Sequence, residues 1–241
     1  MILQGFPRHS VVIDKGRTSI PAWQDRIRDP SLSLLLILEL CAIFLAAPLA
    51  AKGVPIARVV GQTVAFVALV IVVLLSYNRG AIVAILVGVA AIAASALFGV
   101  GWLPIVRSAL HRGGEIVTWL ALIWVVGHAV YAPGRITLHR LQGAAVVYLS
   151  AALLFASAYG LIWELTPASF ANLGASPGGD LEVADLMYFS LTTLTTTGYG
   201  DILAVDPFAR SLANLESVLG VFYIAVTVTR LVTLELRDRS R

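Results

Sequence analysis

The amino-acid sequence predicts an all-α membrane protein with six transmembrane helices, a shorter re-entrant helix and a loop that follows it. Hydrophobic residues make up 59% of the 241 residues and charged residues only 13%, about half the charged fraction of a typical soluble domain. The mean hydropathy is +0.88. The apolar residues also gather into blocks of helix-spanning length, which indicates that lipid surrounds most of the chain.

Six apolar blocks reach or approach the roughly 20 residues that a helix needs to cross a bilayer core of about 30 Å. We expect the spans at residues 31–51, 57–77, 80–104, 115–131, 139–163 and 208–235. An even number of spans places both termini on one side of the membrane. Because Lys and Arg are frequent in residues 1–30 and 237–241, we predict that both termini are cytoplasmic. The basic residues expected to flank outward loops are then Lys52, Arg58, Arg107 and Arg112.

Several classes of protein do not fit this composition. The net charge of +3 comes without the interleaved basic and aromatic residues of a nucleic-acid surface, so we expect no nucleic-acid partner. Cys41 is the only cysteine of the chain, which excludes an internal disulfide and a thiolate metal cluster. We find no hydrolytic triad, nucleotide-binding loop or metal-ligand cluster, so we expect neither an enzyme nor an organic cofactor.

The stretch between the fifth and sixth blocks is neither a span nor a simple loop. Residues 166–179 are rich in Pro, Ala, Ser, Asn and Gly, as in a surface linker, and Asp180 is a candidate N-cap. The apolar run Leu181–Leu194 forms three to four helical turns, too short to cross a bilayer. It ends in a turn that contains two glycines, Thr195–Asp201.

This turn has the residues that a cation pathway requires. A cation enters a narrow pore only if protein oxygens replace its water shell, and backbone carbonyls can do so. Gly198 and Gly200 adopt the unusual dihedrals that aim successive carbonyls inward. We expect the Tyr199 ring to point away from the pore and the Thr196 hydroxyl to add an oxygen at its inner end. Irregular backbone at membrane depth is tolerated where it lines such a path.

The segment resembles the potassium channel family, whose filter reads Thr-Val-Gly-Tyr-Gly. Two further landmarks match. The family's aromatic pair on the pore helix falls at Tyr188 and Phe189, eleven and ten residues before Tyr199, and its gating-hinge glycine falls at Gly220, 21 residues after it. The resemblance covers residues 138–236, so residues 1–137 match only in the number of spans.

The resemblance implies a domain organisation and a potassium site. Residues 1–30 become a cytoplasmic N-terminal segment, 31–137 a peripheral four-helix domain, 138–236 the pore domain and 237–241 a cytoplasmic tail. The implied filter is Thr196, Thr197, Gly198, Tyr199, Gly200 and Asp201, with K⁺ held by Thr196, Thr197, Gly198 and Tyr199. A ring of filter carbonyls requires a C4 homotetramer in a lipid bilayer, which we expect to be the inner membrane of a bacterial cell.

The sequence departs from the family at three supporting positions. Thr197 stands where valine is usual, and its carbonyl serves equally well. The aromatic pair is Tyr-Phe rather than Trp-Trp, so only Tyr188 has a polar group able to reach Asp201. Thr192 occupies a position that is a glutamate behind the filter in some members.

Other residues admit two interpretations. Gly220 is either a hinge or a small residue that lets helices approach. Glu216 in the sixth span either lines the inner cavity or accepts a structural hydrogen bond, and we favour the hydrogen bond. For Glu39 and His128 we likewise favour hydrogen bonds inside the bundle over a sensor role.

Six spans suggest voltage gating, but the predicted fourth span, Glu115–Tyr131, contains no Lys or Arg. A voltage sensor needs about three to four charges per subunit, so we predict a channel that is not voltage-gated. The gating stimulus stays open among lipid, membrane tension, pH and a partner protein. The alternatives to a passive channel are the pore subunit of a potassium transporter and a non-conducting membrane signalling or scaffold protein.

Overall fold

The computed structural model describes residues 22–76, 78–98, 103–131, 138–166, 168–174 and 180–239. This part of the chain is almost entirely helical. Its elements are α1 (Ala22–Cys41), η1 (Ala42–Ala46), α2 (Ala47–Ala51), α3 (Pro55–Leu75), α4 (Arg79–Phe98), α5 (Pro104–Val130), α6 (Leu138–Leu165), β1 (Phe170–Ala171), α7 (Asp180–Leu194), β2 (Leu203–Ala204) and α8 (Pro207–Arg239).

Within the described residues, six helical stretches are long and apolar enough to cross a membrane, which confirms an all-α membrane protein. They are Ser31–Ala51, Pro55–Val73, Arg79–Leu97, Ile105–Val130, Leu138–Leu165 and Pro207–Arg230. The first begins and ends where the sequence predicts. The last belongs to a helix that continues to Arg239, past the predicted start of a tail at residue 237.

The predicted boundaries of the third and fourth spans are wrong. Helix α4 ends at Phe98, and α5 begins at Pro104 instead of Glu115. Proline suits the first turn of a helix because its missing N–H has no intrahelical partner there. Arg112 therefore lies inside a candidate span and does not flank a loop, whereas Arg107 lies near the first turn of α5.

The first span contains a π-helical turn, η1, between α1 and α2. Pro48 follows directly, in the first turn of α2. A proline cannot donate to the carbonyl four residues before it and its ring crowds that carbonyl, so a widened turn is one way to continue the helix.

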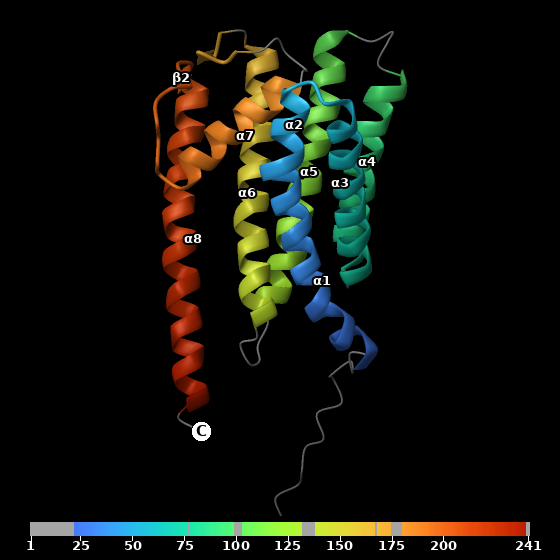
Figure 1. The fold of residues 1–241 in the computed structure, drawn as a ribbon, viewed down its shortest axis with the longest axis vertical. Coiled ribbons are helices and arrows are strands. Elements are labelled where there is room, and N and C mark those ends of the chain that lie inside the picture. The colour runs from blue at the N-terminus through green and yellow to red at the C-terminus, as the bar shows by residue number, and fades with distance from the viewer. Residues whose placement is uncertain are drawn as a thin grey trace, which may run out of the picture.

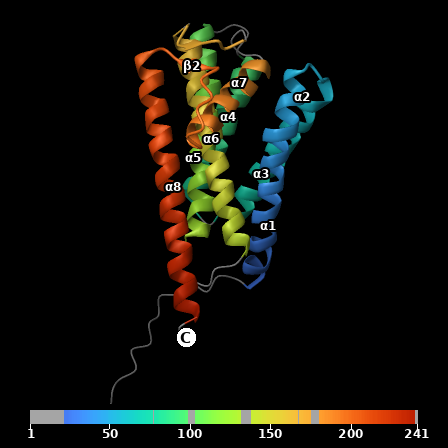
Figure 2. The same cartoon turned by 60° about the vertical axis from the view of Figure 1, so that its left-hand side comes forward.

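The helices form an elongated bundle with α8 along one edge (Figure 1). Helix α6 packs against α5, α1, α7 and α8, and α4 packs on the other side of α5. The view in Figure 2 places α8 on one side of α5 and α6 and places α1 to α3 on the other. The start of α1 and the end of α8 lie at the same end of the bundle, as an even number of spans requires.

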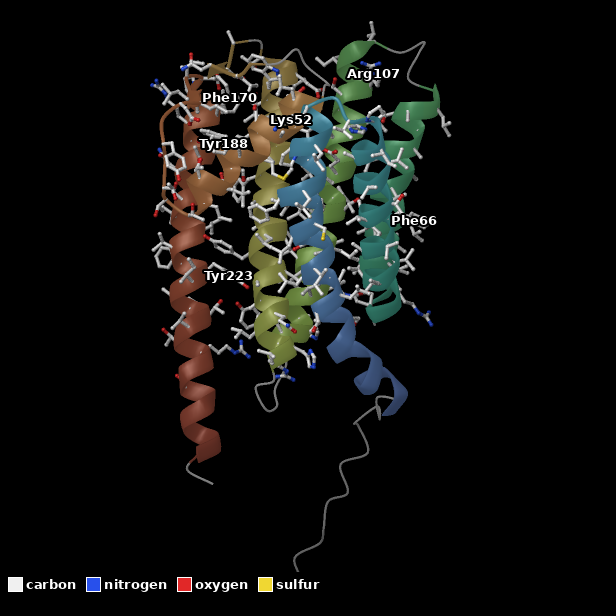
Figure 3. All side chains as sticks on the ribbon, in the orientation of Figure 1. Lys52, Phe66, Arg107, Phe170, Tyr188 and Tyr223 are labelled. Carbon is white, nitrogen blue, oxygen red and sulfur yellow. The ribbon has the colours of Figure 1, made fainter. Side chains whose placement is uncertain are left out.

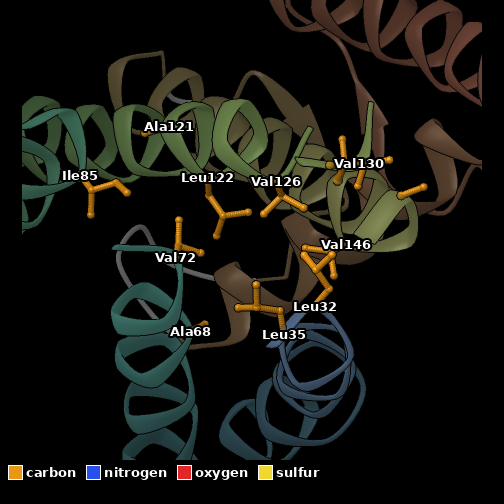
Figure 4. Packing of buried hydrophobic residues seen from close by; sticks show 12 residues of the cluster. Leu32, Leu35, Ala68, Val72, Ile85, Ala121, Leu122, Val126, Val130 and Val146 are labelled. Atoms are coloured by element: carbon orange, nitrogen blue, oxygen red, sulfur yellow. The ribbon is translucent and has the colours of Figure 1, made fainter. Parts of the chain in front are cut away.

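A hydrophobic core joins α1, α3 and α5 to α6. Leu35 of α1, Val72 of α3, Leu122 and Val126 of α5 and Val146 of α6 are all buried in it (Figure 4). Branched side chains from four helices thus meet along the inner face of α5. Ile85 of α4 belongs to the same core, which therefore joins the first five spans.

The linker before α7 also contains structure that the sequence does not predict. Phe170 pairs with Ala204 and Ala171 with Leu203, so β1 and β2 form a short antiparallel ladder. This ladder joins the segment before the short helix to the segment after the loop, and so holds the two ends of the re-entrant region together.

Helices α4 and α5 cross at two glycines. A Cβ on Gly88 would lie 2.3 Å from Thr118 Oγ1 and 2.7 Å from the Gly114 carbonyl oxygen. Small residues at such a crossing let backbones approach closely, which is how helices associate in lipid.

We therefore expect Gly88→Ala to destabilise the protein by about 1–3 kcal/mol, the cost of overpacking a tight contact. The control is Gly113→Ala, where an added Cβ would have no neighbour within 4 Å. It should be neutral or stabilising by roughly 0.5–1 kcal/mol, because alanine favours a helix interior. Thermal unfolding in detergent measures the stability of both variants. Equal unfolding temperatures for Gly88→Ala and Gly113→Ala would contradict a close contact between α4 and α5 at Gly88.

Candidate functional site

The re-entrant helix is α7, Asp180–Leu194, which has the position and length that the sequence predicts. Fifteen residues span about 22 Å, which is less than a bilayer core. Helix α7 packs against α6, α8 and α2 near one end of the bundle, and the loop after it runs back along α8 to β2 (Figures 1 and 2).

The two aromatic residues of α7 point to different surroundings. Phe189 is buried and makes edge-to-face contacts with Tyr159 and Phe170, with ring centroids 5.1 and 5.4 Å apart. Tyr188 instead lies on the side of the loop, and its ring stacks on Tyr199 with centroids 6.2 Å apart. Phe189 therefore anchors the helix, while Tyr188 contacts the loop. Figure 3 shows Tyr188 and Phe170 at the same end of the molecule.

A buried carboxylate braces the middle of α7. Glu216 of α8 is fully buried, and the Tyr159 hydroxyl donates to its Oε2 at 2.5 Å. Ser190 Oγ lies 2.5 Å from Glu216 Oε1 and 2.7 Å from the Ala152 carbonyl oxygen. The hydrogen bonds favoured for Glu216 are thus present, and they join α6, α7 and α8 at one point.

The last four carbonyls of α7 all accept hydrogen bonds, although a helix end leaves them without intrahelical donors. The Thr192 carbonyl accepts from the N–H groups of Thr197 and Gly198 at 2.8 and 3.1 Å. The other three accept from the Thr195 N–H, the Thr196 N–H and the hydroxyl of Tyr148. Thr192 therefore contacts the loop through its carbonyl, while its hydroxyl donates back to Phe189.

The loop itself has an alternating backbone. Residues 196, 198 and 200 have φ values of 56°, 53° and 79°, in the left-handed region. Alternation of left- and right-handed residues turns successive N–H groups to one side and their carbonyls to the other. Two of these N–H groups face the Thr192 carbonyl. In one chain the loop side chains are exposed, with Tyr199 71% accessible.

Asp201 after the loop is tied to α7 and to the linker. The Tyr188 hydroxyl donates to Asp201 Oδ2 at 2.8 Å, and Asn172 Nδ2 donates to the Asp201 carbonyl at 3.0 Å. The hydrogen bond from Tyr188 favours the ionised carboxylate and lowers the pKa of Asp201 below its usual range. The polar contact expected from Tyr188 is present.

Gly220 lies where α8 meets the end of α7. A Cβ there would lie 2.1 Å from the Leu194 carbonyl oxygen, a distance that no side chain tolerates. The close-approach interpretation of Gly220 is therefore correct. Its hinge role stays a prediction, and α8 is helical through this position.

The two other ionisable residues behave differently. Glu39 is buried and accepts a hydrogen bond from the Ser150 hydroxyl at 2.5 Å, as expected. His128 is exposed on the surface of the chain and does not point into the bundle, so the expectation for His128 is wrong.

Comparison with known proteins places this geometry in a family. Residues 144–236 match the family model described as Ion channel. The potassium channel protein kcv of Paramecium bursaria Chlorella virus 1 is 33% identical over 70 residues, which cover 28% of this chain and 73% of the viral protein. The chain belongs to the potassium channel family.

Two longer potassium channel proteins also match part of the chain. The inward rectifier potassium channel Kirbac3.1 of Paramagnetospirillum magnetotacticum is 31% identical over 34% of this chain and 25% of its own length. The potassium voltage-gated channel protein shk-1 of Caenorhabditis elegans is 29% identical over 32% of this chain and 14% of its own length. The chain thus spans a quarter or less of these two relatives. No solved structure matches the chain.

Sequence reasoning missed two residues that support α7 in this family member. Tyr159 and Ser190 both contact Glu216, and neither stands out in an apolar helix. The signal that pointed toward them was Glu216, because a carboxylate in a span requires partners.

We expect Tyr188→Phe to raise the pKa of Asp201 toward its ordinary value, because the hydrogen bond that favours the carboxylate is removed. The contact stabilises the loop at neutral pH and is lost as the pH falls through the pKa of Asp201. Carbon-13 NMR of labelled Asp carboxyls follows the titration. Tyr223→Phe is the matched control, since the Tyr223 hydroxyl donates elsewhere, to Ala144. An unchanged Asp201 titration in Tyr188→Phe would contradict the assignment.

Proposed function

We propose that the chain is the pore-forming subunit of a passive, potassium-selective channel, with the backbone of Thr196–Gly200 as its selectivity filter. The observation that carries the proposal is the alternating backbone at 196, 198 and 200, whose N–H groups at Thr197 and Gly198 are bound on the α7 side. The opposite side of this backbone presents carbonyl oxygens, the ligands that replace the water shell of K⁺.

A single chain supplies one filter strand, so the proposed working unit is a C4 homotetramer in the lipid bilayer. The exposed loop supports this assembly, and so do the exposed apolar side chains of α8, among them Phe208, Val218 and Phe222. We propose that α8 lines the inner cavity and that both termini are cytoplasmic, in a bacterial inner membrane. Nothing besides K⁺ is proposed to bind the filter.

Two other classes of function remain as competitors. A potassium transporter subunit would require coupling to an energy source, and such transporters usually carry four degenerate pore loops in one chain. A scaffold protein would leave the pore non-conducting. One complete loop with left-handed residues at alternate positions favours the passive channel over both.

Potassium flux into liposomes tests the proposal. Purified protein should carry K⁺ down its gradient in preference to Na⁺, without an energy source. Gly198→Ala should reduce the flux by roughly tenfold or more, because a left-handed conformation costs an alanine about 1–2 kcal/mol. Thr197→Val is the control and should conduct, since φ at 197 lies outside the left-handed region. A folded wild-type tetramer without flux would favour the scaffold.

We also expect the current to depend weakly on membrane voltage. The described fourth span holds two arginines, Arg107 and Arg112, below the three to four charges per subunit that a sensor needs. Planar-bilayer recordings between negative and positive potentials give the steepness of activation. A conductance that steepens with several gating charges per subunit would show that the spans before the pore sense voltage.

A further inference from the structure

Arg112 is a buried cation that the proposed permeation path does not use. It lies on α5, and only 5% of its surface is accessible. Gly160 of α6 provides the space, because a Cβ there would lie 2.9 Å from Arg112 Cζ and Nε. Helix α6 therefore has a glycine at the position where the Arg112 guanidinium packs, and a larger residue there would displace this side chain.

Three carboxylates from three helices surround the guanidinium. Arg112 Nε donates to Glu164 Oε1 of α6 at 2.9 Å, and Nη2 donates to Glu182 Oε1 of α7 at 2.7 Å. Nη1 lies 3.3 Å from Glu115 Oε2, one turn along α5. Glu182 is fully buried, so its charge depends on partners within the protein.

The contact with Glu182 acts on the start of the pore helix. Glu182 lies in the first turn of α7, where a carboxylate is also favoured by the N–H groups of the helix end. The guanidinium is planar with five donors in a fixed fork, so it reaches three carboxylates at once. A lysine ammonium has a compact charge and cannot reproduce this geometry.

We propose that Arg112 is a positioning residue for the selectivity filter: through Glu182 and Glu164 it fixes the outer end of α7 against α5 and α6. This inference rests on the proposed function, since it assumes that the loop after α7 is the filter. The hydrogen bond to Glu216 fixes the middle of α7, and the Leu194 carbonyl at the end of α7 lies against Gly220. With Arg112 at the start, the helix that carries the filter is held at three points along its length.

The same network makes the fourth span a static support. Outward or inward movement of Arg112 would break its bond to the buried Glu182, and breaking a buried ion pair is costly. Arg112 therefore does not serve as a mobile gating charge. Its neighbour Arg107 on the same helix is exposed and is the matched control for the loss of one positive charge.

Amide hydrogen exchange of the assembled protein in lipid nanodiscs tests the anchor independently of conduction. In Arg112→Gln, amides in residues 183–190 should exchange at least roughly tenfold faster, because the helix start loses a charge-assisted bond. Arg112→Lys should fall between Arg112→Gln and wild type, and Arg107→Gln should match wild type. Unchanged exchange in α7 of folded Arg112→Gln would overturn the proposal.

A second pair of variants separates the link to α7 from general loss of stability. Glu182→Gln removes the carboxylate on α7, whereas Glu164→Gln removes a carboxylate on α6 and leaves the bond between Arg112 and Glu182. Exchange in residues 183–190 should accelerate more in Glu182→Gln. Equal acceleration in the two variants would assign Arg112 a merely structural role and overturn the inference.

The recordings then connect the anchor to the filter. Arg112→Gln should lower the K⁺ over Na⁺ permeability ratio or speed the decay of current, with partial recovery in Arg112→Lys and no change in Arg107→Gln. A reduced voltage steepness with an unaltered filter would identify Arg112 as a gating charge and defeat the proposal. If the wild type passes no K⁺, the proposed function fails, while the exchange data still decide whether Arg112 anchors α7.

Discussion

A polar group at membrane depth must find its partner inside the protein, and this constraint fixes the arrangement of the helices around α6. Apolar contacts discriminate weakly, because lipid tails are as apolar as leucine. Polar contacts are selective. Ser150 of α6 binds Glu39 of α1, Tyr159 binds Glu216 of α8, and Glu164 binds Arg112 of α5. Each of these contacts sets the register of one neighbouring helix on α6, further polar contacts such as those of Ser33 in α1 and Tyr223 in α8 add to them, and the hydrophobic core fills the space between.

The re-entrant segment meets the same constraint in a different way. Its loop has no regular backbone ladder, so the end of α7 supplies acceptors for the loop N–H groups, and hydroxyls from α6 and α8 donate to the last two carbonyls of α7. This arrangement turns the loop N–H groups toward the protein. The N–H groups of Thr197 and Gly198 thus point toward α7, and in the proposed channel the opposite side of this backbone supplies the carbonyl oxygens that bind the ion. Close approach of α8 at Gly220 completes the packing behind the loop.

The sequence predicts the six spans, α7 and the position of the loop, because each has a local signal: length, hydropathy or the order of glycines. It does not predict the start of α5. Arg112 lowers the hydropathy of residues 104–114, and its compensating partners lie 52 and 70 residues away. The ladder between β1 and β2 is missed for a related reason, since two residues on each side of α7 pair across more than 30 positions. Arg112 therefore suggested a loop when only the sequence was considered, whereas in the fold it makes a tertiary contact inside the bundle.

The distribution of contacts along α8 separates a fixed half from a half held by fewer groups. Before Gly220, α8 contacts the buried Glu216 cluster and the end of α7. After Gly220, the Tyr223 ring contacts Tyr148 and its hydroxyl donates to the Ala144 carbonyl, while Thr227 and Arg230 contact Tyr131. Bending at Gly220 would preserve the contact with Leu194 only if the first half stayed in place. Any hinge at this glycine must therefore move the second half of α8 and leave its first half in place against the end of α7.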